Sequence, residues 1–250
     1  MKTKLKNNQL TIGSWITIGS GEIAEIYANT SLDWICIDLE HSPLDLAECS
    51  SLINIIGSKN KAPLVRLSWN DHVQIKRVMD LGAHGIIVPQ IESPEDCINA
   101  YKAMHYPPTG IRGVGLSRAQ GYGTSFEEYK DWMKQHSILV PQIENKMAIE
   151  NIESIINMPE VDAVILGPYD LSASLGDPGN FDSIAFKDAI IKVETACKKV
   201  NKPIGIHIVE PDPKQLQSKV DQGYTFIAYS VDFRILDVGM RSGIKNVINK

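Results

Sequence analysis

The chain has 250 residues, of which 43% are apolar, and a formal net charge of −5 at pH 7. This length suffices to bury a large core, and it exceeds that of a small binding module. The acidic balance, with no clustered Lys and Arg, argues against a nucleic-acid partner, and no apolar run reaches the 18 residues of a membrane span.

The cysteines and the N-terminal segment point to a reducing compartment. The segment Met1–Gln9 is polar and is not followed by the apolar stretch of a secretory signal. The cysteines are far apart and form no CxxC pair, which argues against zinc and disulfides; they are Cys36, Cys49, Cys97 and Cys197. We therefore expect a cytoplasmic protein.

Short apolar runs alternate with longer segments that have helical periodicity. Several runs are apolar at every position, as strands buried on both faces of a parallel sheet must be. The predicted strands are Thr11–Ile16, Asp33–Asp38, Pro63–Leu67, Gly85–Val88, Ile138–Ile143, Ala163–Leu166, Pro203–Ile208 and Thr225–Ser230.

The segments between the runs predict helices. Asp71–Leu81 and Ser183–Val200 are amphipathic, and Ser93 and Asp212 each precede a proline as an N-cap residue would. Eight β-then-α units without a break in composition favour a single (β/α)8 TIM barrel spanning residues 1–250. A Rossmann-type sheet is the alternative, but the Gly19-Ser20-Gly21-Glu22 turn after the first run is an incomplete dinucleotide fingerprint.

One insertion interrupts this regular alternation. Pro107–Gly123 contains five glycines, two arginines and two prolines. So long a glycine-rich stretch in a compact fold is usually an active-site or interface loop.

Polar residues gather where the predicted strands end, and active sites of such barrels lie at the C-terminal ends of the strands. Among these candidates are Asp38, Glu40, His41, Arg66, Gln90, Gln142, Glu144, Asp170, His207, Glu210 and Asp232.

We call the end of the predicted barrel where the strands have their C-termini the mouth. Two chemistries fit the residues at this mouth poorly. A Schiff-base aldolase needs a desolvated lysine on a strand, and none of the predicted strands contains one. A phosphate site favours glycine-rich turns after the last two strands. The turns at Glu210–Asp212 and Asp232–Arg234 are acidic instead, which favours a substrate without phosphate.

A divalent metal ion fits better. Glu144 and Asp170 are predicted to end neighbouring strands, and two adjacent carboxylates are stabilised by a cation between them. Hard oxygen ligands suit Mg²⁺, Mn²⁺ or a similar ion, which would leave positions for water and a chelating 2-oxo acid. The alternative is that the two carboxylates make ordinary salt bridges.

Two further residues near this mouth suggest catalysis. Arg66 ends an apolar run, where a buried guanidinium needs an anion such as a developing enolate; otherwise it pairs with an acid of the mouth. His41 is the natural proton-transfer residue, and Asp38 and Glu40 lie beside it.

Five motifs at these positions resemble the HpcH/HpaI family of metal-dependent, class II pyruvate aldolases over nearly the whole chain. They are DWICIDLEHSP at 33–43, LVRLSWNDHVQIKRVMDLGAHGIIVPQ at 64–90, GIRGVG at 110–115, PQIENKMAIENI at 141–152 and GPYDLSASLG at 167–176. The resemblance implies a barrel that reversibly cleaves a 4-hydroxy-2-oxo acid, such as a 2-keto-3-deoxy sugar acid or a hydroxy-oxo diacid, to pyruvate and an aldehyde.

The resemblance also implies roles for individual residues. Glu144 and Asp170 are expected to bind Mg²⁺, Mn²⁺ or Co²⁺, with Arg66 stabilising the enolate. His41 is expected to accept a proton and Asp80 to raise its basicity, and we place Asp38 with this catalytic group. The residues expected to bind the substrate are Gln142, Tyr169 through its backbone, Asp170 and Ser172.

Three matters stay open at this point. A citryl-CoA or malyl-CoA type lyase, or a non-catalytic barrel that binds a keto acid, is the alternative function. The family forms homo-oligomers, often hexamers, so Asp80 could act across a subunit interface. Tyr169 stands where the family usually has alanine, and the identity of the aldehyde is not set by these motifs.

Overall fold

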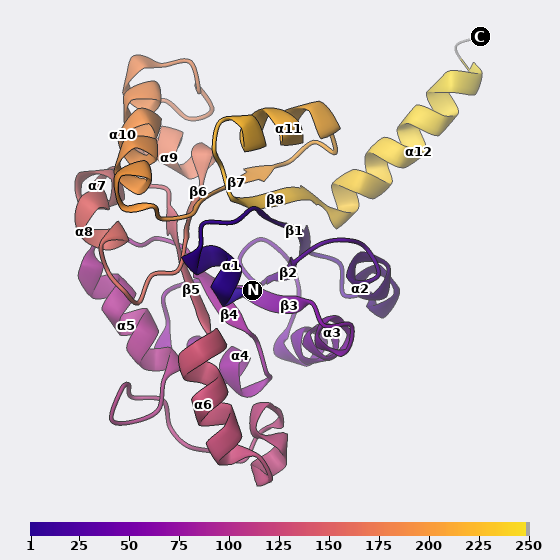
Figure 1. Cartoon of the computed structure of the whole chain (residues 1–250). Helices are drawn as coiled ribbons and strands as arrows, with labels where there is room; N and C mark the ends of the chain where they lie inside the picture. Colours follow the sequence, from indigo (N-terminus) through magenta and orange to yellow (C-terminus); the bar gives the residue numbers. More distant parts are fainter. Residues whose placement is uncertain (249–250) are drawn as a thin grey trace.

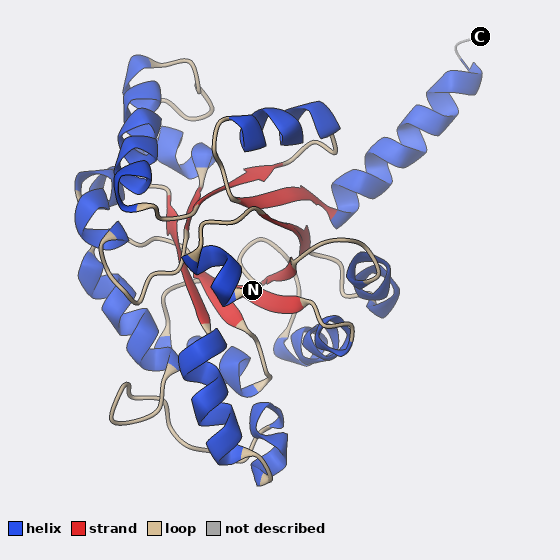
Figure 2. Cartoon of the chain, viewed as in Figure 1, coloured by secondary structure: helices blue, strands red, loops and turns tan. Residues whose placement is uncertain are grey.

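The computed structural model describes residues 1–248 and has a closed barrel of eight parallel strands in sequential order, which confirms the predicted (β/α)8 fold. Figure 1 shows the helices around this barrel, and Figure 2 shows the strands at its centre. The strands are β1 Thr11–Ile16, β2 Trp34–Asp38, β3 Ala62–Arg66, β4 Gly85–Val88, β5 Ile138–Ile143, β6 Val164–Leu166, β7 Ile204–Ile208 and β8 Phe226–Val231.

Helices follow the strands and carry the predicted N-caps. The helices are α1 Lys2–Lys6, α2 Gly21–Ala28, α3 Leu46–Ser58, α4 His72–Asp80, α5 Pro94–Met104, α6 Phe126–His136, α7 Lys146–Glu150, α8 Ile152–Ile156, α9 Pro168–Ser174, α10 Ile184–Val200, α11 Pro213–Asp221 and α12 Asp232–Ile248, with a 3₁₀ segment, η1, at Arg118–Gly123. Ser93 caps α5 in a capping box with Asp96, and Asp212 caps α11.

The sequence prediction of the strands is accurate to within one residue at each end. β1, β4 and β5 have the predicted bounds, and the other strands are shifted or shortened by a single residue. The continuous apolar runs identify buried strands, but only pairing with a neighbour decides where a strand ends.

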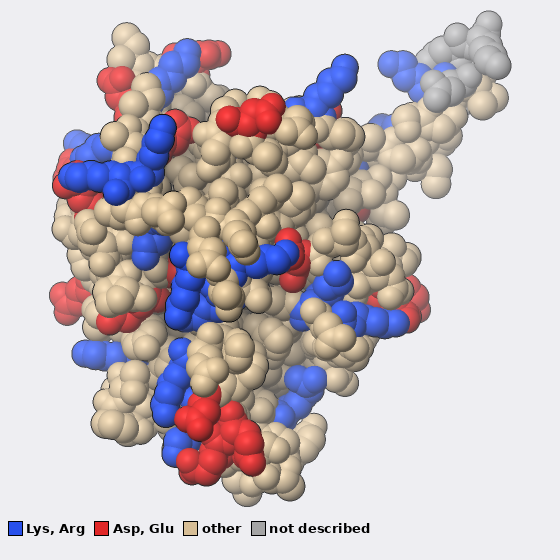
Figure 3. Space-filling view, viewed as in Figure 1, with Lys and Arg blue, Asp and Glu red and all other residues tan. Residues whose placement is uncertain are grey.

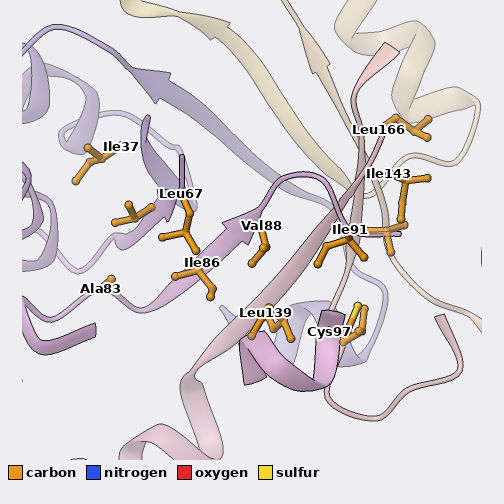
Figure 4. Packing of buried hydrophobic residues seen from close by; sticks show 14 of the residues in the cluster. Ile37, Leu67, Ala83, Ile86, Val88, Ile91, Cys97, Leu139, Ile143 and Leu166 are labelled. Carbon is orange, nitrogen blue, oxygen red and sulfur yellow. The ribbon is translucent and has the colours of Figure 1, made fainter. Parts of the chain in front are cut away.

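The alternation of side chains along each strand divides the core into two layers. The outer layer packs the strands against the helices and includes Ile37, Ile86, Leu139 and Ile143 (Figure 4). The inner layer fills the barrel, where Trp34 and Phe226 stack with ring centroids 4.4 Å apart. The barrel is therefore a packed core and not a pore.

Glycine makes room for this inner layer, and α1 closes one end of it. A Cβ atom at Gly13 would lie 2.0 Å from the Trp34 ring, so no side chain fits at that position. Leu5 of α1 is fully buried against the inner layer, and Figure 1 shows α1 lying across the barrel.

The last helix departs from the usual arrangement, because α12 projects away from the barrel (Figure 1). Its exposed side chains include large apolar ones, namely Phe233, Leu236, Met240, Ile244 and Val247. Within residues 1–248, no helix is both long and apolar enough to cross a membrane.

Charges of both signs are spread over the face drawn in Figure 3. Its main acidic group lies over α6, which carries Glu127, Glu128 and Asp131. This face does not offer the continuous basic surface that a polyanion needs.

His84, just before β4, makes stability depend on pH. Burial lowers its pKa to about 4, and the charges of the N-terminal ammonium, His136 and Arg118 act in the same direction. Between about pH 6.5 and pH 4 the unfolded chain binds this proton and the folded chain does not. The free energy of unfolding therefore falls as the pH is lowered through this window, by up to roughly 3 kcal/mol.

We expect His84→Gln to make the acid limb of stability between pH 6.5 and pH 4 less steep, measured by urea unfolding at several pH values. Part of the slope should remain, because burial also lowers the pKa of His207 to about 4. His72→Gln, at an exposed position on α4, is the matched control. An acid limb in His84→Gln as steep as that of the parent would contradict the assignment.

Candidate active site

A bidentate ion pair joins the C-terminal ends of β2 and β3. Asp38 and Arg66 are the last residues of these strands and face each other in the register. Arg66 Nε lies 2.9 Å from Asp38 Oδ1, and Arg66 Nη2 lies 2.6 Å from Asp38 Oδ2. The guanidinium carbon lies 4.5 Å from the centre of the Trp15 ring. Arg66 is thereby fixed at the barrel mouth by charge, by hydrogen bonds and by cation–π contact.

The acids around Arg66 keep it charged. Burial alone would lower the pKa of Arg66, but the hydrogen bonds and charge of Asp38, followed by the charge of Glu40, raise it above its ordinary value. Asp38 also orders the next turn, because its Oδ1 accepts hydrogen bonds from the backbone N–H groups of Glu40 at 3.0 Å and His41 at 3.3 Å.

Glu40 is a site residue to which sequence reasoning gave no role of its own. Its Oε2 is buried, 3.2 Å from Arg66 Nη1 and 3.8 Å from His41 Nε2. Burial raises the pKa of Glu40 to about 7, against the effect of Arg66. The charges of Glu144, Asp38 and Asp170 raise it further. The signal in the sequence was its position, since Glu40 lies two residues after the end of β2 and thus at the mouth.

Glu144 follows β5 directly and points into the barrel. Strand parity places it on the inner face with Gln142, whose side-chain amide donates a hydrogen bond to Glu144 Oε2. The backbone N–H of Gln90 donates to Glu144 Oε1 at 2.6 Å. Chiefly burial, and also the charge of Asp170, raise the pKa of Glu144, while these two hydrogen bonds oppose the shift.

Asp170 lies near Glu144, but not at a strand end as predicted. β6 ends at Leu166, and Pro168 starts α9, which places Asp170 in the first turn of that helix. A proline favours this first helical position because it lacks an N–H and has a fixed φ. The helix N-terminus and the strand end lie at the same mouth, so the charges of Asp170 and Glu144 still interact.

The mouth therefore holds an excess of negative charge. The charges of Asp38, Glu144 and Asp170 all act on Glu40, and the guanidinium of Arg66 acts on both Glu40 and Glu144. Buried carboxylates at this density are stabilised by a cation, and oxygen donors of this kind suit a hard divalent ion.

Gly167 leaves space for such a site. A Cβ atom there would lie 2.8 Å from Glu144 Oε2 and 2.8 Å from Glu144 Cβ. Within residues 1–248, no group of three or more His, Cys, Asp or Glu side chains is arranged as a metal site.

His41 and Asp80 are not brought together within one chain. His41 lies in the exposed turn after β2, at the mouth. Asp80 ends α4, which runs back toward the N-terminal ends of the strands. Its carboxylate receives hydrogen bonds from Arg112 Nε at 3.1 Å and Nη2 at 2.5 Å, and the Arg112 side chain is fully buried. An effect of Asp80 on His41 would have to come from a neighbouring subunit.

The glycine-rich loop at 107–123 is anchored at the C-terminal end of α4, where Asp80 lies. Besides Arg112, its Arg118 donates to the Leu81 carbonyl at 2.9 Å and to Asn54 Oδ1 at 2.7 Å. The loop exposes Ile111, Val114, Leu116 and Tyr122. Because α4 ends far from the mouth, these anchors hold the loop away from the active site of its own chain. A role of the loop at a subunit interface remains a prediction.

The remaining predicted substrate-binding residues lie on α9. Tyr169 is exposed, and its ring makes an edge contact with Phe181, with the ring centroids 5.0 Å apart. The Ser172 hydroxyl donates to the Tyr169 carbonyl at 2.7 Å and accepts from the Gly179 N–H at 2.8 Å. Ser172 thus orders the first turn of α9, and its contact with substrate remains a prediction.

The chain is similar to known proteins in sequence and in fold. The family model described as HpcH/HpaI aldolase/citrate lyase matches residues 11–236. The chain is 36% identical over 232 residues to a hydroxypyruvate/pyruvate aldolase from Sagittula stellata, covering 92% of this chain and 90% of that protein. It is 35% identical to a 2-dehydro-3,6-dideoxy-6-sulfogluconate aldolase from Pseudomonas putida, covering 93% and 90%.

A solved structure from Burkholderia cenocepacia, described as an HpcH/HpaI aldolase/citrate lyase family protein, superposes with a TM-score of 0.92. It is 30% identical in sequence, with 98% of each chain covered. The resemblance inferred from the motifs is thereby confirmed, as is the predicted enzyme class, a carbon–carbon lyase.

Gly167 provides a test of the site without removing any polar group. We expect Gly167→Ala to push the Glu144 carboxylate out of position and to weaken Mn²⁺ binding by at least about tenfold, measured by isothermal titration calorimetry. Gly57→Ala is the matched control, because a Cβ atom at Gly57 would meet no atom within 4 Å. Unchanged Mn²⁺ affinity in a folded Gly167→Ala protein would argue against a cation at Glu144.

Proposed function

The chain belongs to the HpcH/HpaI aldolase/citrate lyase family, and we propose that it reversibly cleaves a 4-hydroxy-2-oxo acid to pyruvate and an aldehyde. The observation that carries this proposal is the group of carboxylates around the guanidinium of Arg66, of which Asp38 and Glu144 are buried, Glu40 is half-buried and Asp170 is exposed. Relatives named as aldolases for hydroxypyruvate and pyruvate, and for a 2-dehydro sugar acid, support a 2-oxo acid as the substrate.

Glu144 and Asp170 are the residues that would hold the metal ion, which we propose to be Mg²⁺, Mn²⁺ or Co²⁺. The fit rests on their mutual charge effect and on the space that Gly167 leaves at the carboxylate of Glu144. When bound, such an ion supplies Lewis-acid polarisation of the 2-oxo group.

The chain's own residues orient the pyruvate half and receive its charge. We propose that Gln142, which is buried beside Glu144, and the backbone N–H of Tyr169 bind pyruvate oxygens. Arg66, held by Asp38 and stacked on Trp15, would face the negative charge that develops on the 2-oxo oxygen as the C3–C4 bond breaks. A charge fixed in advance in this way stabilises a transition state without reorganisation.

His41 is proposed as the proton acceptor for the C4 hydroxyl. Its position after the turn ordered by Asp38 keeps the imidazole at the mouth and open to solvent, through which the proton can leave. Asp80 is proposed to support His41 of a neighbouring subunit, since within one chain it lies at the opposite end of the barrel. The negative charge of Asp80 would favour the protonated imidazole and so increase the basicity of His41.

We further propose a cytoplasmic homo-oligomer, a hexamer by family resemblance, and α12 supports association between copies. This helix projects from the barrel and exposes the apolar stripe defined above, which in water favours burial against another chain (Figure 1). All four cysteines are free thiols and buried, which agrees with a reducing compartment.

Removal of the metal ion tests the reaction class. We expect EDTA to abolish pyruvate release from a 4-hydroxy-2-oxo acid, and Mg²⁺, Mn²⁺ or Co²⁺ to restore it, followed with a coupled lactate dehydrogenase assay. Glu144→Gln and Asp170→Asn should each raise the metal concentration needed for half-maximal rate. Full turnover by metal-free protein would refute the proposal.

Arg66→Ala tests the enolate stabiliser. Loss of a preorganised charge at the developing oxyanion lowers kcat by ~10²–10³, and we expect Arg66→Lys to recover only part of it because lysine cannot keep the bidentate pair with Asp38. Arg241→Ala, at an exposed position on α12, is the control. If folded Arg66→Ala keeps kcat within a few-fold of the parent, Arg66 has no part in the chemical step.

A further inference from the structure

The ring on which Arg66 stacks, that of Trp15, has no hydrogen bond of its own. The Trp15 side chain is buried inside the barrel, and the guanidinium carbon of Arg66 lies 4.5 Å from the centre of its ring. The indole Nε1 is also buried and makes no hydrogen bond within residues 1–248. The orientation of this ring is therefore set by the groups that pack against it.

His207 of β7 is a second group that packs against Trp15. The two ring centroids lie 5.6 Å apart, with an interplanar angle of 55°. The neighbouring residues Ile204, Ile206 and Ile208 belong to the outer layer of the core, between the strands and the helices. Because side chains alternate along a strand, the imidazole of His207 faces the inside of the barrel.

A β-bulge in β8 lies next to His207. The pairing of β1 with β8 shifts between Gly13 and Trp15, where two residues of β8 lie opposite one residue of β1. One of the two, Ser230, is fully buried and has a left-handed φ of 58°, a conformation that favours glycine. Bulges of this kind are frequent at barrel rims, where they redirect backbone and side-chain groups.

The bulge directs the Ser230 carbonyl toward two side chains of the adjacent strands. It accepts a hydrogen bond from Ser14 Oγ at 3.2 Å and another from His207 Nε2 at 3.2 Å. The Ser230 hydroxyl donates in turn to the Val209 carbonyl at 2.9 Å. Because a carbonyl oxygen only accepts, Nε2 must carry the proton of the His207 ring. The strained residue thus fixes both the position and the tautomer of the imidazole.

The surroundings of His207 also keep it uncharged. Burial lowers the pKa of His207 to about 4, against the hydrogen bond to Ser230. The charge of Arg66 lowers this pKa further and that of Asp38 raises it, so His207 lies close to their ion pair. Near neutral pH, His207 therefore places no second cation against the Trp15 ring, which already holds the guanidinium of Arg66.

We propose that His207 is a positioning residue for Arg66 and acts through Trp15. The inference rests on the proposed aldolase function and deepens it. The Ser230 carbonyl holds the imidazole, the imidazole supports the indole, and the indole supports the guanidinium. Asp38 fixes the same guanidinium through its bidentate pair. This double support is important because a shift of about 1 Å in a reacting group can cost ~10²-fold in rate.

Replacement of His207 tests the ring contact. We expect His207→Gln to lower kcat for pyruvate release about tenfold and to leave KM within about twofold, because Arg66 acts on charge that develops in the transition state. His207→Phe keeps a ring against Trp15 and should retain kcat within about threefold of the parent. His136→Gln, at an exposed position on α6, is the matched control. Equal kcat values for the Gln and Phe variants of His207 would show that the ring contact has no part in the reaction.

A double-mutant cycle tests whether His207 acts through Arg66. We expect His207→Gln to lower kcat about tenfold in the parent but less than about twofold in Arg66→Ala, since residues that act as a unit are not additive. The same loss in both backgrounds would overturn the proposal.

Crystal structures of the parent and of His207→Gln give a readout that does not depend on activity. We expect the Trp15 ring and the Arg66 guanidinium to be displaced in the variant. If both groups keep their positions, the proposal for His207 is wrong, and the aldolase function stands as long as the parent releases pyruvate with Mg²⁺. If the groups move but the parent releases no pyruvate, the aldolase function is wrong and the structural link between His207 and Arg66 stands.

Discussion

Buried negative charge at one end of the barrel is the constraint on which the rest of the site depends. Asp38, Glu40 and Glu144 are buried or nearly so, and each loses hydration in that position. One guanidinium, that of Arg66, lies among them and offsets part of the cost through its bidentate pair with Asp38. The remaining negative charge supports the proposed metal ion. Replacing Arg66 by an apolar residue would leave Asp38 and Glu40 without their partner.

The strands explain how such an arrangement is built. Because side chains alternate between the two faces of a strand, Gln142 and Glu144 both face the inside of the barrel. The pairing register of β2 and β3 places Asp38 opposite Arg66. Backbone groups then complete the site, since Gln90, which has a left-handed φ of 53°, donates its N–H to Glu144. Trp34 and Phe226 stack inside the barrel at the N-terminal ends of their strands. This packed layer supports the site residues, which lie at the C-terminal ends of the strands.

Much of this arrangement can be predicted from the sequence, because it depends on the periodicity of the apolar residues and on the order of the strands along the chain. The apolar runs predicted all eight strands, and reading the residues after each run found Asp38, Arg66 and Glu144. Asp170 was found by the same reading although it lies on α9, since helix N-termini and strand ends share the mouth. The predicted helix Asp71–Leu81 placed Asp80 near a helix end, as α4 confirms, but the partner of Asp80 could not be predicted in this way. Its pairing with Arg112 joins residues 32 apart in sequence, and no local pattern encodes such a contact.

A crevice between α10, α11 and β7 is a second feature that the sequence pattern could not predict. The polar face of α11 looks in sequence like an ordinary solvated helix surface, and only the fold places it across from the apolar wall of α10 and β7. Tyr169 is a similar case, because the motif predicts a contact between its backbone and pyruvate but no role for its side chain. Its ring contacts Phe181, and both residues line the crevice. The first turn of α9 therefore carries two adjacent residues with different surroundings: Asp170, the proposed metal ligand, and Tyr169, whose ring packs against Phe181.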